Sequence, residues 1–220
     1  MSVWAGISPW AVNGGLRPYF EALRNRLLLA FEIQEITHKP KLVAVTSCRE
    51  KSGASTVAAG LAASLSETGD GNVLLVDMNA GEKKSHHFRH GDLKCGLADA
   101  LEQEKRSLAL VSHNLYMVVH NFGDDEFACL LLKRFTHLVS SLKRSDYDYI
   151  IFDLPPVSQI SVTPQLSRYM DNVLMVVESE KTNRDSVKRA GAMLTISGAT
   201  PGVVLNKTRQ YLPRWLRQEV

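Results

Sequence analysis

Long apolar runs, paired cysteines and a strong charge of either sign are all missing from this sequence of 220 residues. No run approaches the roughly 18 unbroken apolar residues of a membrane span. The first residues also lack the basic-then-apolar pattern of a secretory signal. Cys48, Cys95 and Cys129 are scattered, with neither disulfide nor metal-ligand spacing. We therefore expect a protein of the reducing cytoplasm.

The formal net charge of +3 is too small to predict nucleic-acid binding. His86, His87 and His90 crowd one segment, but no cysteine or carboxylate stands at ligand spacing, so we do not expect a metal site there. The chain has no internal repeat and no low-complexity segment. Its length and its 45% hydrophobic content fit one compact α/β domain.

Short apolar runs alternate with helical patterns along the chain. The expected strands are 42–45, 72–77, 115–120, 149–153, 172–179 and 202–206, and the expected helices are 17–35, 54–65, 97–101, 127–143, 164–170 and 182–196. This alternation predicts a doubly wound, mostly parallel sheet with helices on both faces and ligands at the carboxyl ends of the strands. We assign 1–16 to an irregular segment, 17–207 to the domain and 208–220 to a tail.

The most informative stretch is 41–65, KLVAVTSCREKSGASTVAAGLAASL, which predicts a buried strand, a polar loop and a helix of small residues. A helix that starts directly after a strand presents unpaired backbone N–H groups and the positive end of its dipole, and both attract phosphate. Gly53 lets the backbone approach closely, and a following hydroxyl from Ser55 or Thr56 can bind Mg²⁺. Taken alone, the stretch fits an ordinary strand–helix turn equally well.

This loop departs from the phosphate-loop pattern G-x-x-x-x-G-K-[ST]. Gly53 is its second glycine and Ser55 its Mg²⁺ hydroxyl, but Cys48 stands at the first glycine and Ala54 at the lysine. A methyl group cannot neutralise phosphate charge, and losing one such electrostatic partner commonly costs about 10²–10³ in rate. The site is therefore predicted to be impaired.

Two cations stand just upstream of the altered position. Arg49 lies five residues before Ala54, and Lys51 lies within the loop next to Ser52. Either charge can act as a displaced phosphate ligand, or both can be solvated loop charges, which is the interpretation we favour.

Polar residues also follow three other strands. Asp77 ends VLLVD, Asp153 ends YIIFD, and Asn206 follows GVVL. A carboxylate at the tip of a buried strand beside a phosphate loop can hold Mg²⁺, directly or through water. Each aspartate alone is more often a cap or turn residue, but the three together favour a nucleotide site.

From about residue 21 to 207 the chain resembles the cytoplasmic catalytic domain of bacterial tyrosine autokinases, within the wider P-loop ATPase group of chromosome-partitioning and division-site-placement ATPases. The resemblance is carried by the loop unit 42–65, LLVDMN, GLADAL at 96–101, YDYIIFDLPPV at 147–157, MDNVLMVVES, KTNRDSV and GVVLNK at 202–207. It implies ATP or ADP with Mg²⁺, a role in exopolysaccharide or capsule synthesis and export, and a membrane-embedded chain-length regulator as partner. A peripheral position at the inner membrane through that partner follows.

The resemblance also implies roles for single residues. Asp77 and Asp153 match the acidic catalytic residues of the family's second and third motifs. Asn79 stands where the second motif usually has another carboxylate. Asn206 matches a residue that helps to recognise adenine. The implied nucleotide-binding set is Arg49, Lys51, Ser52, Gly53, Ala54, Ser55, Thr56 and Asn206, and the implied Mg²⁺ ligands are Ser55, Asp77 and Asp153. Glu21 and Arg24 match the start of a motif that packs subunits into a homo-oligomeric ring.

The family's C-terminal tyrosine cluster, which accepts phosphate, is missing, because Tyr211 is the one tyrosine after Asn206. Together with Ala54 this favours a regulatory subunit with weakened or lost catalysis. The alternatives are an active ATP-dependent tyrosine kinase that uses Arg49 or Lys51, and a partitioning-type ATPase switch. The chain has neither the Lys-Gly-Gly loop nor the concentrated basic face that the third hypothesis requires.

Overall fold

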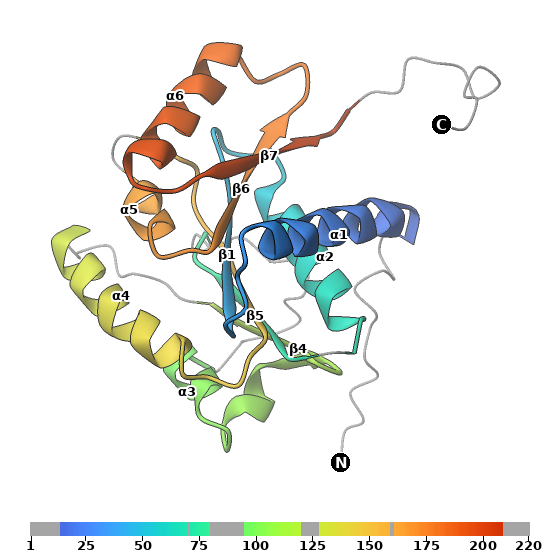
Figure 1. Ribbon diagram of the computed structural model, residues 1–220, viewed down its shortest axis with the longest axis vertical. Coiled ribbons are helices and arrows are strands. Elements are labelled where there is room, and N and C mark those ends of the chain that lie inside the picture. Colours follow the sequence, from blue (N-terminus) through green and yellow to red (C-terminus); the bar gives the residue numbers. More distant parts are fainter. Residues whose placement is uncertain (1–13, 70, 80–94, 120–127, 159–160, 209–220) are drawn as a thin grey trace.

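A seven-stranded sheet forms the centre of the molecule, with strand order β3-β4-β2-β5-β1-β6-β7 (Figure 1). The computed structural model describes residues 14–69, 71–79, 95–119, 128–158 and 161–208. The strands are β1 Lys41–Ser47, β2 Val73–Asp77, β3 Leu110–Ser112, β4 Leu115–Val119, β5 Tyr149–Asp153, β6 Asn172–Glu178 and β7 Pro201–Asn206.

The helices alternate with these strands as the sequence predicts. They are α1 Arg17–Ile33, α2 Ala54–Ser66, α3 Leu97–Leu101, α4 Ala128–Leu142, α5 Thr163–Ser167 and α6 Arg184–Ile196, with short 3₁₀ turns η2 Gly14–Leu16 and η3 Arg106–Ala109. Within the described residues, no helix combines the length and apolar character that a membrane crossing needs.

Every strand pair is parallel except β3–β4, which is antiparallel. The predicted doubly wound, mostly parallel sheet is therefore confirmed. The sequence analysis missed β3, because Leu110–Ser112 is too short to produce a recognisable alternation. The predicted strands and helices otherwise end within a few residues of the observed ones, and the carboxyl ends of β1, β2, β5, β6 and β7 share one edge.

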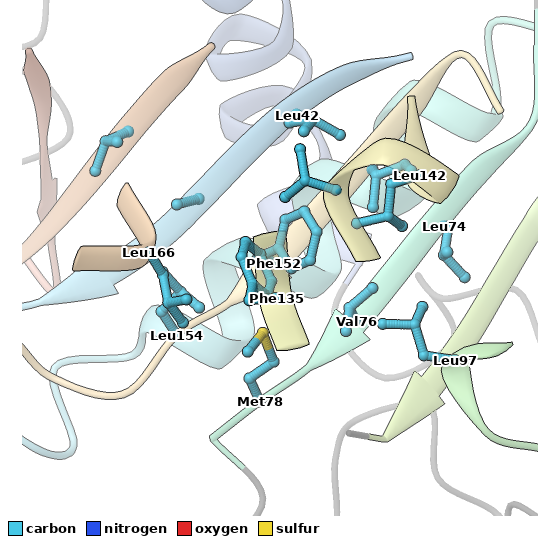
Figure 2. Close-up of a cluster of buried hydrophobic side chains, with 14 of the residues drawn as sticks. Leu42, Leu74, Val76, Met78, Leu97, Phe135, Leu142, Phe152, Leu154 and Leu166 are labelled. Carbon is cyan, nitrogen blue, oxygen red and sulfur yellow. The ribbon is translucent and has the colours of Figure 1, made fainter. Parts of the chain in front are cut away.

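Alternate residues of the central strands enter two separate cores, because successive strand side chains point to opposite faces. In β1, Leu42 and Ala44 belong to the core that includes residues of α3, α4, α5 and α6, whereas Val43 and Val45 belong to the core that includes residues of α1 and α2. Figure 2 shows the first of these cores, where Phe152 of β5 meets Phe135 of α4 with the ring centroids 5.9 Å apart. Burial on both faces explains why these strands read as continuous apolar runs.

The Phe135–Phe152 contact provides a test of this core. Phe152→Ala should lower the free energy of unfolding by about 3–5 kcal/mol, because it removes a fully buried ring and leaves a cavity. Urea denaturation would measure the loss. Tyr19→Ala is the matched aromatic control, since Tyr19 is 62% exposed and its removal should change stability by less than about 0.5 kcal/mol. Equal losses in both variants would contradict the described packing.

Candidate functional site

The candidate site lies where β1 gives way to α2. The connecting loop ends at Gly53, whose φ of 93° places it in the left-handed region directly before the first helical residue, Ala54. Glycine adopts this conformation without the Cβ penalty that other residues meet. A Cβ added at Gly53 would also lie 2.3 Å from Asn206 Nδ2, so a side chain is excluded on two counts.

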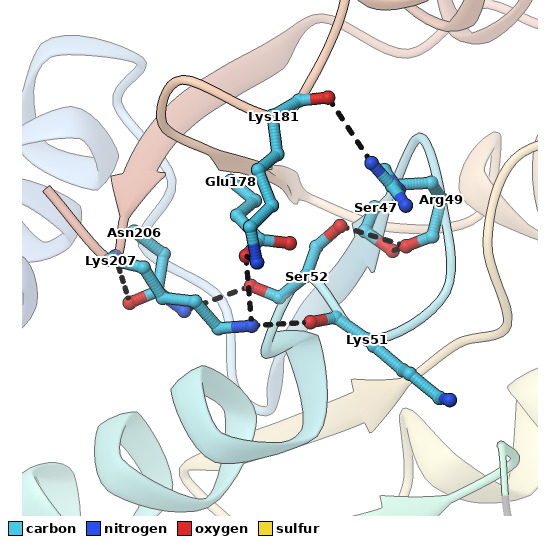
Figure 3. Close-up of polar contacts among 8 residues, drawn as sticks. All are labelled: Ser47, Arg49, Lys51, Ser52, Glu178, Lys181, Asn206 and Lys207. Atoms are coloured by element: carbon cyan, nitrogen blue, oxygen red, sulfur yellow. Dashed lines mark hydrogen bonds and ion pairs between the residues drawn. The ribbon is translucent and has the colours of Figure 1, made fainter.

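The end of β7 is fastened to this loop. Asn206 Nδ2 donates a hydrogen bond to the Ser52 carbonyl oxygen at 2.9 Å, and Lys207 Nζ donates to the Lys51 carbonyl oxygen at 2.6 Å (Figure 3). We call this pair of contacts the β7 clasp. The loop is therefore held by residues of β7 that lie more than 150 positions away in sequence.

Two residues of the β7 clasp adopt a left-handed backbone although they carry side chains. The φ angles are 61° at Lys51 and 56° at Lys207. Each such conformation costs about 1–2 kcal/mol for an ordinary L-residue. Strain of this kind is kept where surrounding contacts hold it, and it concentrates at functional sites.

Hydrogen bonds within the loop hold its first half. The hydroxyl groups of Ser47 and Ser52 both donate to the Arg49 carbonyl oxygen, at 2.7 and 2.8 Å. The Arg49 guanidinium points to the other side, where Nη1 donates to the Lys181 carbonyl oxygen at 3.1 Å (Figure 3). Arg49, one of the two candidates for a displaced cation, is therefore directed toward the β6–α6 connection.

A cavity of about 330 Å³ opens over the loop and the start of α2. Its lining residues are Ser47, Glu50, Lys51, Ser52, Gly53, Ala54, Ser55, Thr56, Asn79, Pro156 and Lys207. Backbone N–H groups of the first turn of α2 and the positive end of the helix dipole favour an anion at this position. The cavity thus unites most of the residues that the sequence predicted to bind nucleotide.

Asp77 and Asp153 end neighbouring strands in matched register, and both are buried. The backbone N–H of Asn79 donates to Asp77 Oδ1 at 2.9 Å, and Asn79 lines the cavity. The register of β1 with β5 pairs Asp153 with Val45, close to the start of the loop. The two carboxylates therefore lie at the predicted edge, although neither is among the residues that line the cavity.

These oxygen donors fit Mg²⁺, which binds through one or two carboxylates plus phosphate and water oxygens. Among the described residues, no group of three or more His, Cys, Asp or Glu side chains is arranged to hold a metal ion alone. Ser55, Asp77 and Asp153 as Mg²⁺ ligands therefore stay a prediction that depends on a bound nucleotide. The histidines at 86, 87 and 90 lie outside the described residues.

The residues predicted to pack subunits have contacts within the chain. Arg17 Nε pairs with Glu21 Oε1 at 2.9 Å on α1. Arg24 Nη1 donates to the carbonyl and hydroxyl oxygens of Ser64 on α2, at 3.1 and 3.3 Å. Arg24 thus docks α1 on α2, and a subunit interface through Glu21 and Arg24 stays a prediction.

Glu178 and Lys207 are site residues that the sequence analysis did not identify. Glu178 ends β6 with its side chain 5% exposed, and its Oε1 pairs with Lys181 Nζ at 3.0 Å and with Lys207 Nζ at 3.3 Å. The hydrogen bond from Lys181 first, and then that from Lys207, hold the pKa of Glu178 below its ordinary value. The available signal was a charged residue at the last position of a buried strand, the same signal that identified Asp77 and Asp153.

Two other side chains have structural rather than chemical roles. Burial raises the pKa of the Cys48 thiol, which makes this loop cysteine less reactive. Tyr147 is buried, its hydroxyl donates to the Ala100 carbonyl oxygen at 2.9 Å, and desolvation raises its pKa. Tyr147 is therefore placed as a core residue, not as a phosphate acceptor.

The close approach of Gly53 to Asn206 predicts a coupling between the two positions. Gly53→Ala should lower the free energy of unfolding by about 1–3 kcal/mol, from backbone strain and from the clash with Asn206. In an Asn206→Ala background the cost should be smaller, because the clashing amide is gone while the strain remains. Thermal unfolding of the four chains closes the double-mutant cycle. Equal costs in both backgrounds would contradict the clash.

The Glu178 ion pairs predict a pH dependence of stability. Because the folded-state pKa is lowered, the unfolded chain takes up a proton first as the pH falls. The contribution is complete above the ordinary carboxyl value of about 4.3 and is lost as the pH falls through the lower folded-state pKa. The melting temperature of the unmodified chain should therefore exceed that of Glu178→Gln at pH 7, with the gap narrowing as the pH falls below the ordinary carboxyl value. The exposed Glu104→Gln serves as control, and a gap that does not narrow in acid would refute the pairing.

Comparison with known proteins identifies the family. The family model described as "Cellulose biosynthesis protein BcsQ" matches residues 40–193. The putative tyrosine-protein kinase EpsB of Ralstonia nicotianae is 30% identical over 197 residues, which cover 86% of this chain and 26% of that relative. The chain thus spans about a quarter of the length of EpsB.

A second relative is matched over most of its own length. The tyrosine-protein kinase CpsD of Streptococcus agalactiae is 26% identical over 198 residues, covering 87% of this chain and 82% of CpsD. The kinase domain of the Escherichia coli tyrosine kinase ETK superposes with a TM-score of 0.72 at 20% identity, covering 97% of this chain and 86% of that domain, and supports the fold. The predicted resemblance is confirmed, and the chain belongs to the family of the cellulose biosynthesis protein BcsQ, with the P-loop ATPase-like fold of the bacterial tyrosine kinases that it resembles.

Proposed function

We propose that the chain is a nucleotide-binding regulatory subunit of bacterial polysaccharide biosynthesis in which phosphate transfer is weakened or lost. It works in the cytoplasm beside a membrane-embedded chain-length regulator, and it recruits ATP or ADP with Mg²⁺ to the loop cavity. The names of the matching family and of the kinase relatives support this setting.

The single observation that carries the proposal is the identity of residue 54. Ala54 is the first residue of α2, is 7% exposed and lines the cavity, at the position where a phosphate loop carries its lysine. The surrounding frame is retained, with Gly53 in the left-handed region and the helix dipole directed at the cavity. Such a frame binds phosphate, but the charge that stabilises phosphate transfer from position 54 is lost.

The described residues divide the work of binding. Backbone N–H groups of Gly53 to Thr56 bind the phosphate oxygens, while Ser55 with Asp77 and Asp153 holds Mg²⁺ directly or through water. When bound, the ion neutralises phosphate charge. Asn206 keeps the loop in place through Ser52 and lies directly beside Gly53.

Three tyrosines of the described residues are placed in the core. Tyr147 is buried, and Tyr116 and Tyr149 lie on core strands. These side chains support the sheet rather than present hydroxyl groups for phosphorylation, which fits a weak autokinase.

An active protein-tyrosine kinase is the second candidate, and the kinase names of the relatives favour it. Because residue 54 is alanine, an active kinase requires that a cation from another position contact the transferred phosphate. Arg49 and Lys51 are the predicted substitutes, and the Arg49 guanidinium is directed at Lys181 rather than at the cavity.

Restoring the lysine tests the proposal. Ala54→Lys should bind MgADP and MgATP at least about tenfold more tightly than the unmodified chain, because a charge-assisted phosphate contact is worth about 1.5–3 kcal/mol. Isothermal titration calorimetry measures the affinity, and transfer of labelled phosphate from ATP to tyrosine measures activity. The unmodified chain should transfer little phosphate.

Thr68→Lys is the matched charge control, because Thr68 is exposed at the far end of α2. Its affinity for nucleotide should equal that of the unmodified chain. Tight binding with rapid tyrosine phosphorylation by the unmodified chain would overturn the regulatory proposal and support the active kinase. Unchanged surface polysaccharide after deletion of the gene would refute both.

A further inference from the structure

Lys207 brings a positive charge to the loop, although it lies 156 positions after Lys51 in the sequence. It follows β7 directly, lines the loop cavity, and donates from Nζ to the Lys51 carbonyl oxygen at 2.6 Å. Its side chain is 46% exposed, so the ammonium group is accessible from the cavity. The loop therefore has a cation at its mouth although residue 54 is alanine.

The other basic side chains around the loop are directed differently. Arg49 reaches the Lys181 carbonyl oxygen, and the Lys51 side chain extends away from Lys207 and from the loop carbonyl groups (Figure 3). Lys181 shares Glu178 with Lys207 but is not part of the cavity lining. Of these four cations, Lys207 is the one that both lines the cavity and contacts the loop backbone through its side chain.

The position of Lys207 is built by its neighbours. Asn206 anchors the end of β7 to Ser52, and its Oδ1 accepts the backbone N–H of Lys207 at 2.8 Å. The left-handed backbone at Lys207, with φ of 56°, turns the chain at this point. The nearly buried carboxylate of Glu178 then draws Nζ toward the loop. These contacts of Asn206 and Glu178 thus hold the Lys207 side chain at the cavity wall.

We infer that Lys207 replaces the missing loop lysine and binds the phosphate groups of a nucleoside di- or triphosphate in the loop cavity. This inference rests on the proposed nucleotide binding and assigns its charge-neutralising residue. The ammonium group donates to the neutral carbonyl oxygen of Lys51, and a phosphate oxygen that carries negative charge is a stronger acceptor. Ligand binding then exchanges the contact with Lys51 for one with phosphate, while Glu178 keeps the side chain close.

Calorimetry on the full chain tests this assignment with MgADP as the probe. Lys207→Gln should weaken MgADP binding about tenfold or more, because it removes a charge-assisted phosphate contact. Lys181→Gln is the matched control: it removes the same charge and the same Glu178 partner from outside the cavity, and it should weaken binding less than about threefold. Adenosine, which has no phosphate, should bind Lys207→Gln and the unmodified chain equally.

A double variant separates loss of charge from loss of structure. In Ala54→Lys/Lys207→Gln the restored loop lysine should return MgADP affinity to at least that of the unmodified chain. Thermal unfolding of each variant checks that the domain is folded. Failure of this rescue in a folded double variant would contradict the inference.

The remaining outcomes distinguish the two proposals. If the unmodified chain binds MgADP and Lys207→Gln binds equally well, the inference is wrong and the proposed nucleotide binding stands. If the unmodified chain fails to bind while Ala54→Lys binds, Lys207 does not compensate, although the loop frame is competent. If neither binds, the proposed function fails together with the inference.

Discussion

The hydrogen bond from Asn206 to Ser52 is the contact on which the candidate site depends. It ties the last residue of β7 to the loop, and it requires Gly53 because a Cβ would meet the Asn206 amide. The same anchor fixes the backbone from which Lys207 reaches the Lys51 carbonyl oxygen. One amide therefore sets the loop conformation, the start of α2 and the position of the nearest ammonium group. The central sheet supports this arrangement by bringing the carboxyl ends of β1, β2, β5, β6 and β7 to one edge.

The site keeps the backbone shape of a phosphate-binding loop, and the proposed source of its positive charge is Lys207 instead of residue 54. Shape comes from the backbone, through Gly53, the helix dipole and the bonds to Arg49 carbonyl oxygen, none of which needs a lysine at residue 54. Charge comes from a side chain and can be delivered from another element of the fold. Glu178 supports this arrangement because its carboxylate pairs with the side chains of Lys181 and Lys207. Glu178 itself does not line the cavity.

Much of the fold was predictable because both faces of the sheet are covered, which gives the strands β1, β2, β5 and β6 unmistakable apolar runs. The short edge strand β3 gave no such run, and it was missed. The loop, its departures and the two strand-end aspartates were predicted from local pattern and topology. Lys207 and Glu178 were not, because their meeting depends on side-chain direction and on the turn after β7, which residue order does not specify. The direction of the Arg49 guanidinium toward Lys181 was hidden for the same reason.

The position of β7 at the border of the sheet has a mechanical consequence. β7 pairs with β6 along one edge and is the last strand in the order of the sheet, and its Val203 and Leu205 side chains are exposed on one face. An outer strand of this kind separates from its sheet more readily than an interior one, since half as many neighbours hold it. Because the phosphate loop is fastened to that outer strand, peeling of β7 and loosening of the loop form a single event. Any force that acts on Asn206 or Lys207 is transmitted directly to the loop through the β7 clasp.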